Sequence, residues 1–150
     1  MKTIIAVFAM GIAITQANAQ KMNAKDVPVN VKNSLEKNYA IKDADWDKEG
    51  ENFEASFEQK GTAISVVFDG AGSILETERE IKKNELPIAI LNVLKKDYAD
   101  FEIEEAARIE TKGVITYETE VEKGKQTFDL IFDTNGKLIK KLSKEDEKRD

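Results

Sequence analysis

The stretch ELPIAILNVLKKDYA, residues 85 to 99, determines the fold, because it recurs as DVPVNVKNSLEKNYA, residues 26 to 40, at a shift of 59 positions. Both copies place a proline near their start, a position that suits the first turn of a helix, and both end on Tyr-Ala. Apolar residues recur at every fourth position. Each copy therefore predicts an amphipathic helix that buries one stripe: Val27, Val31 and Leu35 in the first, and Leu86, Ile90 and Leu94 in the second. Asp26 is expected to cap the first helix.

After each helix the apolar period falls from 3.6 to 2, which predicts four antiparallel strands per copy. In the first copy Trp46 is expected opposite Phe53, across a turn at Glu49-Gly50. A later turn, Asp69-Gly70-Ala71-Gly72, recurs as Asp133-Thr134-Asn135-Gly136 at a shift of 64. The apolar positions expected to face the helices are Phe53, Ala55, Phe57, Ile64, Val66 and Phe68, and then Tyr117, Thr119, Val121, Phe128, Leu130 and Phe132.

The repeat predicts an α+β fold: a tandem repeat of a helix plus a four-stranded antiparallel meander. We expect the two copies to form one curved sheet of about eight strands with the helices on one side. The expected segments are a signal peptide (1 to 19), a linker (20 to 25), the first repeat (26 to 84), the second repeat (85 to 142) and a charged disordered tail (143 to 150).

The N-terminus is typical of a secretory signal peptide. One early lysine, Lys2, precedes an apolar run from Ile4 to Ile14, and the small-residue triplet Ala17-Asn18-Ala19 is a cleavage motif. The run is shorter than the ~20 residues of a bilayer span, so a membrane anchor is disfavoured. We expect a periplasmic or secreted protein with no membrane insertion after cleavage.

Composition narrows the function classes. The 150 residues contain no His and no Cys, so the usual neutral-pH acid-base group, the thiolate nucleophile and the commonest zinc ligands are missing, and we expect no enzyme. The net charge of −6 argues against nucleic acid and against anionic membranes as partners. A protein or peptide partner, cationic in character, is the better expectation.

Two helices that open on a hydrophobic-Pro pair and end in Tyr, each followed by a meander with a Phe-Asp-x-x-Gly hairpin, resemble the PepSY-like periplasmic proteins of Bacteroidetes-type bacteria. These are similar in fold to the secreted beta-lactamase-inhibitory protein. The resemblance covers residues 26 to 142 and implies a non-enzymatic binding or inhibitory role without a cofactor. The inhibitory protein is disulfide-stapled, whereas this chain has no cysteine.

The alternation also predicts a binding face. Residues that alternate with the apolar positions should lie on the opposite face of the sheet, which is expected to be open, acidic and suited to a cationic partner. The alternative is a solvated surface without a partner. The candidate partner-binding residues are Glu54, Ser56, Glu58, Val67, Glu118, Glu120, Glu122, Asp129 and Ile131.

Three functions are compatible with the sequence. The first is an exported protein-binding module that inhibits or modulates an envelope or secreted enzyme. The second is a periplasmic binder of a small ligand or of calcium, although the Asp133 turn lacks the downstream glutamate of a calcium loop. The third is a carboxylate-based hydrolase, which requires two converging carboxylates.

Overall fold

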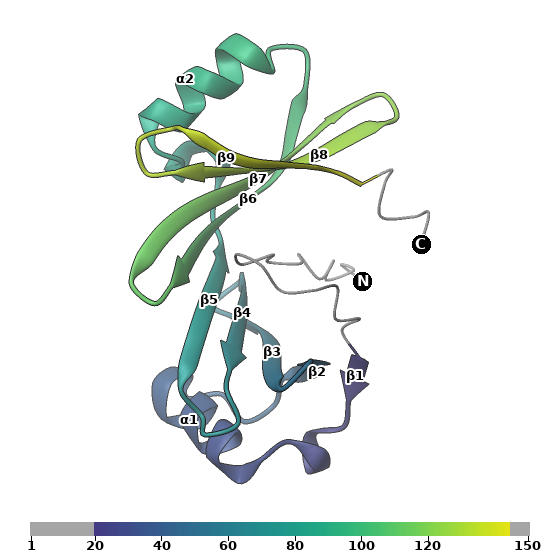
Figure 1. The fold of residues 1–150 in the computed structure, drawn as a ribbon, viewed down its shortest axis with the longest axis vertical. Helices are drawn as coiled ribbons and strands as arrows, with labels where there is room; N and C mark the ends of the chain where they lie inside the picture. Colours follow the sequence, from purple (N-terminus) through teal and green to yellow (C-terminus); the bar gives the residue numbers. More distant parts are fainter. Residues whose placement is uncertain (1–19, 145–150) are drawn as a thin grey trace. The chain divides into compact units, whose positions relative to one another are not determined.

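The computed structural model describes residues 20 to 144, which form nine strands, two α-helices and two 3-10 helices (Figure 1). The expected signal peptide, and the expected tail beyond Lys144, lie outside the described residues. In chain order the elements are β1 (Gln20–Met22), η1 (Ala24–Asp26), α1 (Val29–Tyr39), β2 (Asp45–Glu49), β3 (Asn52–Gln59), β4 (Thr62–Phe68), β5 (Ile74–Glu80), η2 (Lys83–Glu85), α2 (Ile88–Asp97), β6 (Glu102–Thr111), β7 (Val114–Lys123), β8 (Gln126–Asp133) and β9 (Leu138–Ser143).

The predicted α+β fold is confirmed. The described strands form an open antiparallel sheet in chain order, from β1 to β9. The sheet has nine strands rather than about eight, because residues 20 to 22, expected in a linker, pair with β2 as β1. Lys21 lies opposite Asp47 and Met22 opposite Trp46 in this pairing.

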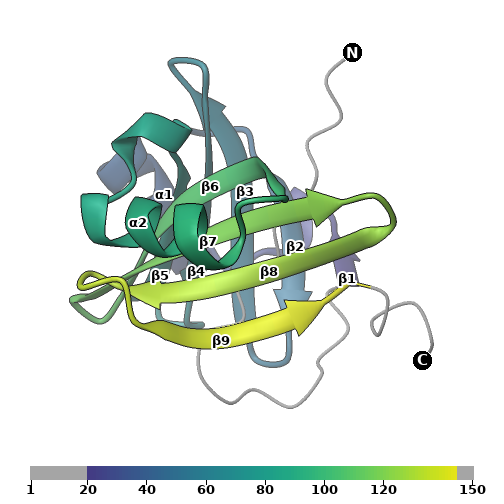
Figure 2. The same ribbon diagram turned by 90° about the horizontal axis from the view of Figure 1, so that it is seen from above.

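The chain divides into two compact units between Arg79 and Glu80, five residues before the boundary that the repeat suggested. Each unit has its own apolar core between its helix and its strands. The first core contains Val27, Val31, Leu35, Trp46, Phe53, Ala55, Phe57, Ile64, Val66 and Phe68. The second contains Leu86, Ile90, Leu94, Ala106, Val121, Leu130 and Phe132, with Tyr117 and Phe128 partly buried against them. In Figure 2, α2 crosses the strands β7 and β8 that it covers.

Both helices begin in the same way. Pro28 and Pro87 are the N-cap residues, one position outside the helix, and Asp26 lies in the preceding 3-10 turn rather than capping α1. The carbonyl oxygen of Pro28 accepts bonds from the amides of Val31 and Lys32, at 3.1 and 3.2 Å. Pro87 accepts the equivalent bonds at 3.0 and 3.1 Å. Proline fits here because its extended ψ directs the carbonyl into the first turn and its missing N–H removes no helical bond.

The expected pairing of Trp46 with Phe53 was wrong. Trp46 lies opposite Ala55, because the turn between β2 and β3 consists of Gly50 and Glu51. Gly50 has a φ of +61°, which suits the first central position of a tight hairpin turn. The error is two residues in register, so the faces are preserved and Trp46 is still buried in the first core.

The Asp-x-x-Gly turns are the same in both units. Asp69 Oδ1 accepts the amides of Ala71 and Ser73, at 2.9 and 2.8 Å. Asp133 Oδ1 accepts those of Asn135 and Lys137, both at 2.9 Å. These Asx-type bonds close the β4-β5 and β8-β9 hairpins. They also explain the Asp in each copy without a metal ion.

Candidate functional site

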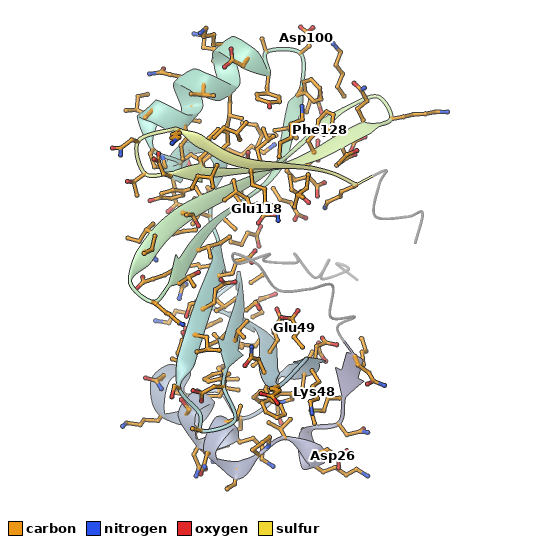
Figure 3. The ribbon with its side chains drawn as sticks, in the orientation of Figure 1. Asp26, Lys48, Glu49, Asp100, Glu118 and Phe128 are labelled. Atoms are coloured by element: carbon orange, nitrogen blue, oxygen red, sulfur yellow. The ribbon has the colours of Figure 1, made fainter. Side chains whose placement is uncertain are left out.

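The acidic candidate residues lie on the strand face turned away from the helix of each unit, which we call the outer face. Figure 3 shows the alternation in both units: Lys48 and Phe128 lie on the helix side, and Glu49 and Glu118 on the opposite side. Each unit has its own outer face. The predicted face assignment follows from the cores, since Phe53, Ala55 and Phe57 are buried against α1 while the residues between them point away.

In the first unit a row of cross-strand neighbours runs over four strands. Asp47 on β2 lies opposite Glu54 on β3, Glu54 opposite Val67 on β4, and Val67 opposite Glu76 on β5. A second row contains Asp45, Ser56, Ser65 and Glu78. The two rows are linked by a hydrogen bond from the Ser65 hydroxyl to Glu54 Oε1. Four strands thus place five carboxylates in two adjacent rows.

This clustering raises carboxyl pKa values in the first unit. Burial is the largest cause of the raised pKa of Glu49, which reaches about 6, and repulsion by Glu54, Glu76 and Asp47 adds to it. Burial also raises the pKa of Glu54, against the opposing effect of the Ser65 hydrogen bond. Like charges that face one another across strands destabilise a sheet. The first outer face therefore holds negative charge at a cost in stability.

The outer face of the second unit repeats the arrangement of facing carboxylates and also contains cations, since Lys140 lies opposite Ile131 and Lys144 lies beside Glu120. Glu105, Glu120 and Asp129 lie directly opposite one another on β6, β7 and β8. Lys144 Nζ forms an ion pair with Glu120 and lies 3.6 Å from Asp129 Oδ1. Burial lowers the pKa of Lys144, whereas its carboxylate partners raise it. The partners outweigh the burial, so the pKa lies above its ordinary value. Burial raises the pKa of Glu105, with repulsion by Glu120 as the next cause.

The expectation that all candidate residues are open to solvent was wrong for three of them. Glu118 is 4% exposed, Asp129 9% and Ile131 8%. Alternation assigns a residue to a face and does not say what covers it. Glu118 and Ile131 occupy central positions of a row flanked by Ala107 and Lys140, and Lys144 lies beside Asp129. The other candidates are half-buried or exposed: Glu54, Ser56, Val67 and Glu120 are half-buried, and Glu58 and Glu122 are exposed.

Several residues of the outer faces were not predicted. Asp45, Asp47 and Glu49 alternate with Trp46 on β2, and Glu76 and Glu78 alternate with Thr77 on β5. The signal for the β2 residues was present in the sequence, because the side chains on either side of a core tryptophan must face away from it. For Lys144 there was no signal, since it lies in the segment expected to be disordered.

Residues 20 to 144 contain neither a cluster of metal ligands nor a membrane-spanning helix. These residues contain no group of three or more potential ligands arranged to hold a metal ion. Neither α-helix of the described range has the length and apolarity of a bilayer span. Since Asp133 Oδ1 is engaged with two backbone amides, its turn is a structural hairpin.

Comparison with known proteins places this arrangement in context. A family model described as "Putative beta-lactamase-inhibitor-like, PepSY-like" matches residues 13 to 75 and 51 to 140. No curated protein matches the chain.

Solved structures of proteins from Bacteroides species share the fold. A structure from Bacteroides eggerthii, described as that of "putative periplasmic proteins", has a TM-score of 0.73 at 16% identity and covers 78% of this chain and 88% of its own. A DUF2874 family protein from Bacteroides uniformis has a TM-score of 0.71 at 20% identity, with 77% and 88% covered. A BLIP-like protein from Bacteroides fragilis has a TM-score of 0.64 at 24% identity, with 77% and 84% covered.

Proposed function

The chain belongs to the PepSY-like family, and from this premise we propose that it is an exported, non-enzymatic module that binds a cationic protein or peptide through its acidic outer faces. The neighbours in fold include a protein described as periplasmic and one described as BLIP-like. A periplasmic location and removal of residues 1 to 19 as a signal peptide are part of this proposal. Its finer form is that the partner is an envelope or secreted enzyme, which binding inhibits or modulates.

The observation that carries the proposal is the facing of like charges in both units. Asp47 lies directly opposite Glu54, and Glu120 lies directly opposite both Glu105 and Asp129. A solvated face would be as soluble with carboxylates spread at random, and carboxylates that face one another across strands lower the stability of the sheet. A cationic partner would relieve the repulsion on the first outer face, and binding there would be favoured by that relief. On the second outer face Lys144 already pairs with Glu120 and Asp129, so Glu105 is the carboxylate of this row that such a partner would engage.

The outer faces also suit a partner with mixed surface chemistry. Ser56 and Ser65 supply hydroxyl groups between the carboxylates, and the half-buried Val67 supplies an apolar contact at the centre of the first unit. A cationic segment with apolar residues between its lysines or arginines would match this pattern.

The test is a pull-down from envelope extract with the chain lacking residues 1 to 19, compared with a charge-reversed variant. Because Glu118 is buried and Glu120 is paired with Lys144, reversing them would disturb folding, so the exposed residues of the same faces are preferable. The double variant Glu58→Lys/Glu122→Lys should keep its unfolding midpoint and should bind the recovered partner with a lower association rate. Raising salt from 0.15 to 0.5 M, which roughly halves the Debye length, should have the same effect.

The matched control is Asp43→Lys/Asp97→Lys, which makes the same change in net charge at exposed positions outside the strands. It should bind like the unmodified chain. Equal loss in both double variants would reduce the effect to net charge alone. Binding that is insensitive to the outer-face variant and to salt would exclude the acidic faces as the interface.

A further inference from the structure

The outer edge of β9 is a surface of the second unit that is not part of the acidic outer face. Among residues 20 to 144, β9 pairs with β8 and is the last strand of the sheet, and it lies at the margin of its unit in Figure 2. Its side chains include two exposed apolar residues, Leu138 and Ile139, which are 37% and 55% exposed. We propose that the outer edge of β9 binds an extended acidic segment of a partner protein as an additional strand.

The backbone geometry of β9 identifies the groups that such a strand would engage. The Lys144 amide donates to the Thr127 carbonyl on β8 at 3.1 Å. Since donors alternate sides along a regular strand, the amides of Leu142 and Lys140 also face β8, and those of Ser143 and Lys141 face the outer edge. The alternation ends at Ile139, where β9 has a β-bulge opposite Ile131 and Phe132. An added strand would therefore bond to the backbone of Lys141 and Ser143 without displacing any bond to β8.

The charge of β9 selects the chemistry of the partner. Residues 137 to 144, KLIKKLSK, hold four lysines and no acid, whereas the whole chain carries −6, which leaves −10 for the rest. A basic edge on an acidic protein favours an acidic strand, because opposite charges across strands attract. A second copy of the chain fits poorly, since two-fold antiparallel pairing about the centre of β9 would place Lys140 opposite Lys141.

Edge lysines often serve only to block strand addition. Here two of them turn back onto the protein. Lys141 Nζ lies 3.7 Å from the centre of the Phe128 ring and 5.3 Å from that of Tyr98, and Lys144 is paired with Glu120. Because the Lys141 side chain lies over the rings of Phe128 and Tyr98, it leaves the backbone edge accessible and keeps its positive charge close to it. The charge of Lys144 is compensated by Glu120 and leaves the edge accessible as well.

The experiment measures amide hydrogen exchange of β9 in the full chain, with three hexapeptides as probes. These are Glu-Val-Glu-Val-Glu-Val, its counterpart with Lys in place of Glu, and Glu-Val-Glu-Pro-Glu-Val, in which proline blocks strand pairing. The first peptide should slow exchange at Lys141 and Ser143 and leave Lys140 and Leu142 unchanged. The other two should give no protection, and added salt should weaken binding of the first.

Two variants separate the backbone edge from the side chain. Lys141→Pro removes one outward amide and no bond to β8, so it should abolish protection at Ser143, whereas Lys141→Ala, which loses the same side-chain contacts, should retain it. Far-UV circular dichroism and a thermal scan establish that both variants fold, and the unmodified chain tests the proposal even if Lys141→Pro does not.

The proposal is overturned if the two outward amides exchange slowly before any peptide is added, because the chain would then cover its own edge. Equal protection by the acidic and basic peptides, or no protection by any of them, would also overturn it. The surface is separate from the acidic outer faces, so its failure leaves the proposed function untouched.

Discussion

Gly72 lies directly against the backbone of Asn30: a Cβ atom added to Gly72 would be 2.6 Å from the Asn30 carbonyl oxygen. The second unit has the same relationship, with a Cβ on Gly136 at 2.8 Å from the carbonyl carbon of Ala89. In each unit, therefore, the tip of a hairpin touches the first turn of the helix. The Phe-Asp-x-x-Gly sequence is repeated because its Asp shapes the turn and its Gly permits this close approach.

Gly136→Ala should destabilise the protein by about 2 to 4 kcal/mol, combining a positive φ of 84° with a backbone clash. The matched control is Gly113→Ala, which has a similar φ of 83° but nothing within 4 Å of the added Cβ. It should cost about 1 kcal/mol. Urea unfolding of the three proteins gives the comparison, and equal losses in the two variants would show that the hairpin tip does not press on α2.

Phe68→Ala and Phe132→Ala should each cost roughly 3 to 5 kcal/mol in free energy of unfolding. Both side chains are fully buried at equivalent positions of the two cores. Val114→Ala is the control, since Val114 is 63% exposed, and should change stability by less than about 0.5 kcal/mol. Equilibrium denaturation measures all three, and a loss below about 1 kcal/mol at both phenylalanines would contradict the assignment of the faces.

The sequence predicted the helices, the strands and their faces because these follow from periodicity. Val31 and Ile90, the centres of the two helical stripes, are both fully buried. Register was less predictable, because it depends on which two residues form the turn. The choice of Glu49-Gly50 over Gly50-Glu51 displaced Trp46 by two positions. The strand β1 was missed because three residues are too few to show alternation.

The sequence predicted on which face of the sheet the candidate residues lie, but not how deeply each of them is buried. Glu118 and Glu58 have the same alternation signal, yet Glu118 is buried and Glu58 is exposed. The two residues differ in their neighbours across the strands, which depend on register: Glu118 lies between Ala107 and Ile131, whereas Glu58 lies opposite Ala63 on β4 and beyond the last paired residue of β2. Local sequence patterns do not carry that information.

Lys144→Met should destabilise the second unit by about 1 to 3 kcal/mol. It removes the cation from Glu120 and Asp129, whose side chains are only 18% and 12% exposed, and leaves two facing carboxylates. The control is Lys42→Met, which breaks the exposed Lys42-Glu36 pair, where the side chains are 75% and 51% exposed. Such a pair contributes about 0 to 1 kcal/mol. Thermal or urea unfolding near pH 7 distinguishes the two, and a cost at Lys144 no larger than at Lys42 would mean that its partners are adequately solvated.

The pH dependence of stability should carry a signature of Glu49. Its pKa of about 6 in the folded protein lies above the ordinary value of 4.5, so between these values the folded state binds more protons than the unfolded state. Stability should therefore fall as pH rises from 4.5 through 6, and the penalty should be fully present above that range. The turn residue Asp69 acts in the opposite direction, since backbone hydrogen bonds lower its pKa, but its contribution is lost only as pH falls below about its ordinary value of 3.8.

Glu49→Gln should flatten this fall and raise the urea midpoint at pH 7.5 relative to the unmodified chain, because it removes a half-buried charge repelled by Glu54. A carbon-detected NMR titration provides the direct measurement, with a Glu49 midpoint near 6 in the unmodified chain. In Glu54→Gln that midpoint should move down toward 4.5, because repulsion by Glu54 is the largest cause after burial. If Glu49 titrates at 4.5 in the unmodified chain, then neither burial nor repulsion by the other carboxylates of the first outer face raises its pKa appreciably.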